Sequence, residues 1–109
     1  EILTNLLHNA IKYSPEGGNV RCEVGCAHGI ATLKVSDEGI GIPAGDLPKI
    51  FETFYRAANS GDIGGTGIGL SIVRRAVELH LGSVDVQSTP GHGTTFTVRL
   101  PINAPEEPT

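Results

Sequence analysis

Apolar residues recur at helical spacing in two stretches of the chain, residues 1–13 (EILTNLLHNAIKY) and residues 70–81 (LSIVRRAVELHL). In both, a period of 3.6 gathers the apolar residues on one face, which predicts an amphipathic helix. Pro15 and the glycines after it end the first helix, because proline disfavours helical geometry at the residue before it. Gly82 is the expected C-terminal stop of the second helix.

Alternating apolar and polar residues predict four strands, over residues 19–26, 30–37, 83–88 and 94–100. The first two form a hairpin that turns at His28 and Gly29. Residues 39–48 read as a loop, and residues 49–57 (KIFETFYRA) predict a short helix or turn. The expected inward-facing strand residues are Ala31, Leu33, Val35, Val84, Val86, Phe96, Val98 and Leu100. This order of helices and mostly antiparallel strands predicts an α+β sandwich with helices on one face of the sheet.

Composition limits what this chain can be. Its 109 residues include 39% hydrophobic residues, which suits one small domain with one core. The net charge of -4 provides no general attraction to nucleic acid or anionic lipid, so neither is an expected partner. The sequence has neither an apolar run long enough to cross a bilayer nor a signal peptide, which favours a cytoplasmic setting.

The two cysteines, Cys22 and Cys26, share one face of the first predicted strand. Four residues apart on a strand, they are too distant to bond to each other. They also lack the second pair of ligands that a zinc site needs. We therefore expect buried, reduced thiols.

Four glycines stand immediately before the second helix, in "DIGGTGIGLSIV" (residues 62–73). A helix start exposes unpaired N–H groups at the positive end of the helix dipole, and glycines let that backbone approach a phosphate. The stretch fits an anion-binding loop, although it matches neither G-x-x-x-x-G-K-[ST] nor G-x-G-x-x-G. A surface turn punctuated by glycine is an equally good interpretation of this stretch alone.

A second glycine pair follows Asp37 in "DEGIGIP", at the end of a predicted strand. A carboxylate there could accept a hydrogen bond from an exocyclic amine while bare backbone lets a flat ring pack closely. An ordinary surface turn beginning with Asp would look similar.

The polar face of the first helix carries Asn5, Asn9 and Lys12. Such a face is most often simply solvated. Its functional interpretation is an Asn oxygen on Mg²⁺ and a Lys on phosphate, because Mg²⁺ keeps waters and takes its other ligands from a nucleotide.

Taken together and in this order, these stretches resemble the motifs of bacterial sensor histidine kinases, within the superfamily that also contains gyrases, heat-shock chaperones and mismatch-repair ATPases. "NLLHNAIKYS" is similar to the N box, "DEGIGIP" to the G1 box, "IFETFYRA" to the F box and "GGTGIGLSIVRRAVELH" to the G2 box. The closing "STPGHGTTFTVRLP" looks like the family's last glycine turn and strand. The resemblance implies a Bergerat-type fold with a mostly antiparallel mixed sheet, bound to ATP and Mg²⁺.

The resemblance also implies roles for individual residues. Asp37 would bond the adenine amine, Asn9 would hold Mg²⁺ and Lys12 would meet phosphate. Phe51 and Phe54 would anchor a lid over residues 57–64. The implied catalytic residues are Asn5, Lys12 and Arg56. The implied nucleotide contacts are Asn9, Lys12, Tyr13, Asp37, Gly39, Gly41, Ile42, Gly65, Thr66, Gly67, Gly69, Leu70 and Thr94.

Asn5 separates branches of this superfamily. Members that hydrolyse ATP carry Glu four residues before the Mg²⁺ Asn, where a carboxylate can act as general base. An amide cannot accept the proton, so Asn5 favours phosphoryl transfer to a histidine of another domain. A non-catalytic nucleotide-binding or scaffold module is the alternative, and an ATP-driven conformational machine is disfavoured.

The resemblance places the phosphoacceptor histidine in a separate dimerisation domain of the parent protein, expected to be a homodimer, with a response regulator downstream. We expect His8, His28, His80 and His92 to be ordinary residues, and the domain itself to make no direct membrane contact even if the parent protein is membrane-anchored.

The expected domain covers residues 1–101, with a disordered tail over 102–109. By comparison with the family it resembles, we expect the domain to lack its first strand and helical lead-in, which would leave a sheet edge and apolar surface uncovered and predicts marginal stability or self-association. Leu81 stands where the family often has a second Gly, a departure expected to alter only the helix end.

Overall fold

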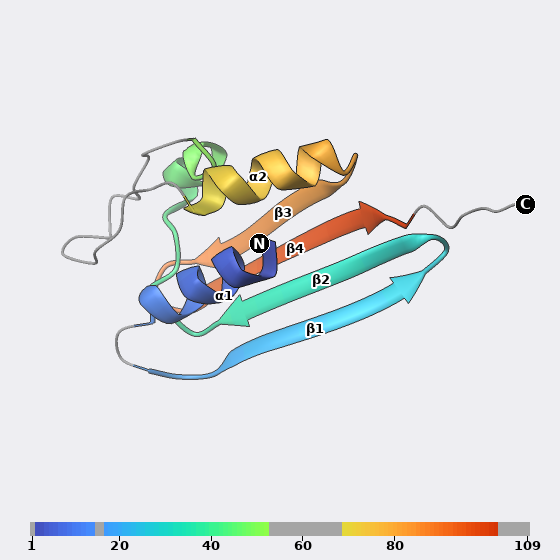
Figure 1. Cartoon of the computed structure of the whole chain (residues 1–109). Coiled ribbons are helices and arrows are strands. Elements are labelled where there is room, and N and C mark those ends of the chain that lie inside the picture. Colours follow the sequence, from blue (N-terminus) through green and yellow to red (C-terminus); the bar gives the residue numbers. More distant parts are fainter. Residues whose placement is uncertain (1, 15–16, 53–68, 103–109) are drawn as a thin grey trace, which may run out of the picture.

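The computed structural model describes residues 2–14, 17–52 and 69–102. Two helices and four strands make up most of this part of the chain (Figure 1). A short 3-10 helix, η1, stands between the first hairpin and the second helix. The elements are α1 (Ile2–Lys12), β1 (Val20–Ala27), β2 (Ile30–Asp37), η1 (Ala44–Lys49), α2 (Gly69–Leu79), β3 (Ser83–Thr89) and β4 (Gly93–Pro101). Both helices and all four strands lie within one or two residues of their predicted ranges.

The strands form one sheet in the order β1-β2-β4-β3. All three pairings between the described strands are antiparallel. The β1–β2 turn has two residues with positive φ, His28 at 53° and Gly29 at 75°, as a two-residue hairpin of type I′ requires. Both helices cover the same face of the sheet (Figure 1). The predicted two-layer α+β architecture is therefore confirmed.

The core lies between the helices and the sheet. The register places Val35 of β2 opposite Phe96 of β4, and Phe96 opposite Val86 of β3, so inward side chains form a row across the sheet. The buried apolar residues are Leu6, Ala10, Val35, Ile50, Val73, Val77, Phe96 and Val98. Leu33, Val84, Val86 and Leu100 are partly buried and pack against this cluster. The predicted inward faces of β2, β3 and β4 are therefore confirmed.

The end of α2 differs from the prediction at one residue. Leu81, and not Gly82, adopts the left-handed conformation, with φ of 61°. The Gly82 N–H donates to the Val77 carbonyl at 2.9 Å and the Leu81 N–H to the Glu78 carbonyl at 3.0 Å, which is the Schellman pattern. Gly82 is required for a different reason, since a Cβ there would collide with the Arg99 carbonyl of β4.

The structure corrects the loop predicted for residues 39–48, because η1 occupies its second half. Pro48 lies inside η1 and has no N–H to donate, which limits the segment to a short 3-10 helix. The following Ile50 is buried in the core, and the ring of Phe51 meets that of Phe96 edge to face, with centroids 6.1 Å apart. Phe51 therefore anchors this segment, whereas residues 53–57 lie outside the described part.

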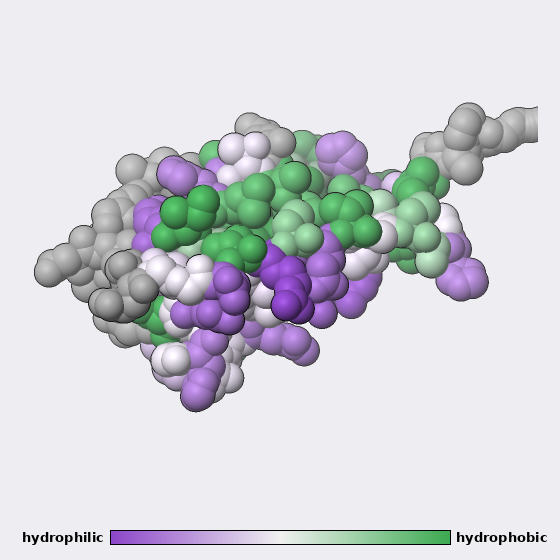
Figure 2. Space-filling view, turned by 90° about the horizontal axis from the view of Figure 1, so that it is seen from below, coloured by the Kyte–Doolittle hydropathy of each residue, from purple (hydrophilic) through white to green (hydrophobic). Residues whose placement is uncertain are grey.

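The expectation that Cys22 and Cys26 are buried is wrong, because both are exposed. They lie on β1, one of the two edge strands of the described sheet, and every residue of β1 is exposed. The helices do not cover this strand. Figure 2 shows apolar surface gathered along this side of the molecule. The exposed large apolar residues of α1, β1 and the beginning of β2 are Leu3, Ile11, Val20, Val24 and Ile30.

Candidate functional site

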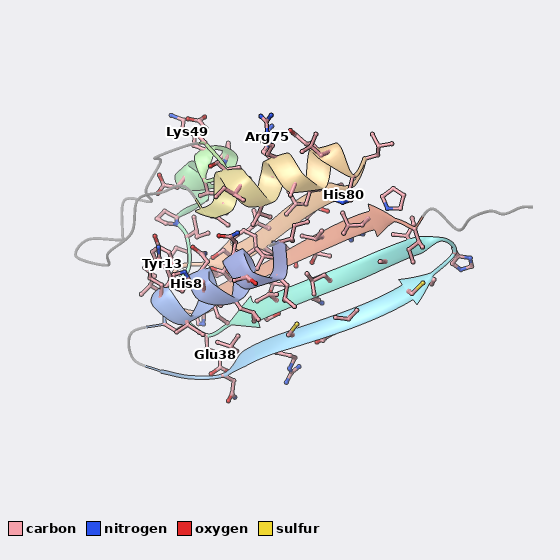
Figure 3. The ribbon with its side chains drawn as sticks, in the orientation of Figure 1. His8, Tyr13, Glu38, Lys49, Arg75 and His80 are labelled. Carbon is pink, nitrogen blue, oxygen red and sulfur yellow. The ribbon has the colours of Figure 1, made fainter. Side chains whose placement is uncertain are left out.

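The loop after β2 is bonded directly to the end of α1. The Ile40 N–H donates to the Tyr13 carbonyl at 3.0 Å. A Cβ on Gly39 would collide with this same carbonyl, so only glycine allows the two segments to come this close. Figure 3 shows Tyr13 and Glu38 at the same end of the molecule, on the two segments that meet here. The polar end of α1 and the exit of β2 therefore form one continuous surface.

Asp37 lies at the centre of this surface, at the end of β2, and is only partly exposed. Its carboxylate accepts the Gly39 N–H at 2.8 Å and also the N–H of Thr94. Burial raises the pKa of Asp37 above its ordinary value, and the two hydrogen bonds oppose part of that shift. A carboxylate held in this way has acceptor capacity left for one further donor.

The β3–β4 turn forms the next wall of the site. Gly93 has φ of 115°, and a Cβ on it would collide with the Asp37 carbonyl. The Gly91 N–H donates to the Ile40 carbonyl at 2.8 Å, which ties the turn to the loop after β2. Thr94 pairs with Asp37 in the sheet register and is 7% exposed. The structure therefore brings together Asp37, Gly39 and Thr94, although Asp37 and Thr94 are 57 positions apart in the sequence.

Ser88 belongs to this cluster, although it is not among the site residues predicted from the sequence. Its hydroxyl accepts the Ile42 N–H at 2.7 Å, donates to the Gly93 carbonyl at 2.9 Å and bonds the Thr94 hydroxyl at 2.8 Å. The signal in the sequence was its position, because Ser88 has the same strand parity as Val84 and Val86. A polar residue at an inward position needs hydrogen-bond partners.

The predicted polar face of α1 approaches the start of α2. The Oδ1 atom of Asn5 lies 3.4 Å from the place that a Cβ on Gly69 would occupy. Asn9 follows one turn later on α1 and is partly buried. The Lys12 ammonium lies 5.3 Å from the centre of the Tyr13 ring. Residues predicted from two separate motifs therefore lie side by side.

The remaining predicted residues divide into two groups. Ile42 and Leu70 are partly buried against the core, and a Cβ on Gly41 would collide with the Thr89 carbonyl. These three residues therefore have structural reasons for their identity, whether or not a ligand contacts them. The predicted site residues that lie outside the described part of the chain are Arg56, Gly65, Thr66 and Gly67, together with Phe54 and the predicted lid over residues 57–64.

The four histidines are all exposed, as suits ordinary surface residues. A ring nitrogen of His80 lies 2.8 Å from the Ala76 carbonyl near the end of α2, and Figure 3 shows His8 on the other helix, α1. Within the described residues, no three His, Cys, Asp or Glu side chains group together as a metal site would require.

The family profile described as "Histidine kinase-, DNA gyrase B-, and HSP90-like ATPase" matches residues 1–104. The chain belongs to this family. It is therefore an ATP-binding domain of this kind, and the resemblance inferred from its motifs is confirmed.

Relatives of this ATPase domain include sensor histidine kinases. TmoS of Ectopseudomonas mendocina is 47% identical over 96% of the chain, and WalK of Bacillus subtilis is 42% identical over 98% of it. The chain spans only 11% and 18% of the length of these two relatives.

Two solved structures have the same fold as this domain. The mycobacterial sensor histidine kinase MprB aligns with a TM-score of 0.83 and 35% identity, over 92% of this chain and 69% of that one. Full-length ShkA in complex with AMPPNP aligns with a TM-score of 0.78 and 32% identity, over 92% of this chain and 20% of that one. No helix among the described residues of the ATPase domain is long and apolar enough to cross a membrane.

Proposed function

We propose that this chain is the catalytic domain of a two-component sensor histidine kinase, which binds Mg-ATP and donates the γ-phosphate to a histidine on a separate dimerisation domain. The observation that carries the proposal is the partly buried Asp37 carboxylate, held by the N–H groups of Gly39 and Thr94 where three segments of the chain meet. The similarity to sensor histidine kinases over nearly the whole chain supports it.

Asp37 would recognise the purine. Its carboxylate is an acceptor, so it suits the exocyclic amino group of adenine rather than the oxo group of guanine. The backbone of Gly39 and Gly41 would lie against the ring, and Thr94 would lie at its edge. ShkA, a relative solved with the ATP analogue AMPPNP, supports a nucleotide ligand for this fold.

The phosphates would lie between α1 and the start of α2. The N-terminus of α2, an 11-residue helix beginning at Gly69, would direct backbone N–H groups of its first turn and the positive end of its dipole toward an anion. Lys12 would add a positive charge from the last turn of α1. By the family resemblance, Gly65, Thr66, Gly67 and Arg56 would complete this phosphate site.

Asn9 would be the protein ligand of Mg²⁺. The residues fit that ion, because an amide oxygen is a ligand that Mg²⁺ accepts, and one protein ligand suffices where waters and phosphates supply the rest. Asn9 lies one turn beyond Asn5, whose Oδ1 is close to Gly69. When bound, the ion would neutralise charge on the phosphates.

Transfer to another domain, rather than hydrolysis, is the reaction that Asn5 favours. It stands where ATP-hydrolysing members carry a basic carboxylate, and an amide does not accept a proton from water. The catalytic contribution of this domain would then be positioning and charge stabilisation by Lys12 and Arg56. The acceptor domain of a homodimeric parent would supply the nucleophile, a response regulator would receive the phosphoryl group, and the domain would work in the cytoplasm.

Titration calorimetry with ADP tests the nucleotide assignment. Asp37→Asn should weaken ADP binding by about 10- to 100-fold, the range expected when a hydrogen bond to a charged group is lost. The variant should fold at least as well as the original chain. Burial raises the pKa of Asp37, so the ionised carboxylate lowers stability above its ordinary pKa, and Asn removes that penalty. Unchanged ADP affinity in a folded Asp37→Asn variant would refute the assignment.

Phosphoryl transfer needs its own test, because binding does not establish it. The chain is incubated with γ-labelled ATP and an acceptor-bearing helical domain of a related kinase added in trans. Acid-labile, base-stable label on the acceptor supports the kinase. Tight ATP binding with no labelled acceptor from any related kinase would contradict it and favour a nucleotide-binding scaffold.

A further inference from the structure

The hydroxyl of Ser88 uses its full hydrogen-bonding capacity beside Asp37. It accepts the Ile42 N–H at 2.7 Å, donates to the Gly93 carbonyl at 2.9 Å and bonds Thr94 Oγ1 at 2.8 Å. A hydroxyl has one proton to donate and two lone pairs to accept with, so these three bonds leave it none to spare. The Ser88 hydroxyl oxygen, on β3, is thus hydrogen-bonded to both the loop after β2 and the start of β4.

These bonds determine where the Thr94 proton points. The Gly93 carbonyl can only accept, so the Ser88 proton lies on that bond and Thr94 must be the donor in the Ser88–Thr94 bond. Thr94 Oγ1 can therefore accept a hydrogen bond from a ligand but has no proton left to donate to one. The Thr94 N–H is also committed, because it donates to the Asp37 carboxylate. The pair formed by Asp37 and Thr94 therefore presents acceptors only.

We propose that Ser88 is a positioning residue that makes this site select a 6-amino purine over a 6-oxo purine. It acts through Thr94, by holding the threonine proton away from the ligand. A 6-oxo group placed beside Asp37 and Thr94 would meet acceptors on both sides and would be left unpaired. If Ser88 is replaced by Ala, the Thr94 hydroxyl is free to rotate and donate to that oxo group. This inference rests on the proposed nucleotide function and adds the origin of its base selectivity.

The matched probes are ADP and IDP, which differ at position 6 and in the proton on N1. Titration calorimetry on the 109-residue chain measures both dissociation constants. The original chain should prefer ADP. Ser88→Ala should reduce the ratio of the two affinities by about fivefold, the factor that corresponds to one net hydrogen bond of about 1 kcal/mol. Ser88→Thr keeps the hydroxyl and should retain the original ratio.

Thr94→Val supplies a second variant, which removes the threonine hydroxyl without changing the shape of the side chain. It should reduce the ADP preference as well, and adding Ser88→Ala to it should change the ratio no further. If Ser88→Ala does not fold, Thr94→Val alone decides the outcome, because the inference requires its ADP preference to fall.

An unchanged ratio of the ADP and IDP affinities in Ser88→Ala overturns the inference, whether or not both affinities fall. A residue with a purely structural role would weaken both ligands equally and leave this ratio unchanged. Equal binding of ADP and IDP by the original chain also overturns it. These outcomes differ from failure of the proposed function, in which Asp37→Asn leaves ADP affinity unchanged.

Discussion

Replacing Leu81 by Gly should stabilise the domain, because Leu81 is a leucine held in a conformation that suits glycine. Its φ of 61° places it in the left-handed region, at the position after α2 where a Schellman motif usually has Gly. The left-handed conformation costs a residue with a side chain about 1–2 kcal/mol. Leu81 is 84% exposed, so little packing is lost with its side chain.

The expected gain is smaller than that cost. Glycine makes the unfolded chain more flexible, and this lowers the stabilisation by about 0.5–1 kcal/mol. The net stabilisation from Leu81→Gly is then about 0.5–1 kcal/mol. For a domain of this size, that shifts the melting temperature upward by about 2–5 °C.

The assay is chemical or thermal unfolding followed by circular dichroism, with Leu79→Gly as the matched control. Leu79 is the last residue of α2 and is 71% exposed, so the two variants make the same chemical change two positions apart. Leu79→Gly should destabilise by about 0.5–1 kcal/mol, since glycine inside a helix is unfavourable. Equal melting temperatures for the original chain and Leu81→Gly, or a lower one in Leu81→Gly, would show that Leu81 carries no backbone strain.

Three further outcomes are expected. Gly39→Ala should destabilise the domain by about 1–3 kcal/mol in urea unfolding, because its Cβ would collide with the Tyr13 carbonyl just after α1. Gly45→Ala should change stability little, because a Cβ there would have open space around it. ADP affinity should stay constant above the raised pKa of Asp37 and fall as the pH drops through that pKa, at a higher pH than an ordinary Asp would give. Calorimetry across a pH series checks this, and a similar fall in Asp37→Asn would contradict it. Cys22 and Cys26 should both react with a thiol reagent in the folded domain as fast as in urea, because both are exposed on an edge strand, and slow reaction of either would contradict the description of β1.

Local rules were enough to predict the elements of this domain. Helical and alternating periodicity placed α1, α2 and the strands, because each element must turn one apolar face toward the same core. Short connections between strands made antiparallel pairing the natural expectation. The motif order then indicated the family, although the roles of Arg56 and of residues 65–67 stay predictions, since these residues lie outside the described part of the chain.

Burial could not be predicted in the same way. The alternation in β1 is as regular as that in β4, yet every residue of β1 is exposed, whereas β4 contains Phe96 and Val98 in the core. The difference comes from where the helices and the core lie, because β1 and β3 are both edge strands and only β3 packs side chains, Val84 and Val86, against the core. No pattern within β1 contains that information.

The kind and place of each element, and the family to which the motifs belong, can be predicted from the sequence because they depend on neighbours along the chain. Contacts between distant segments arise only in the folded domain: Gly39 meets Tyr13, Gly93 lies against Asp37, and Ser88 joins three segments through one hydroxyl. Such contacts depend on sheet register and helix placement, which are properties of the whole core, and the acceptor-rich surface around Asp37 exists only after that core has formed.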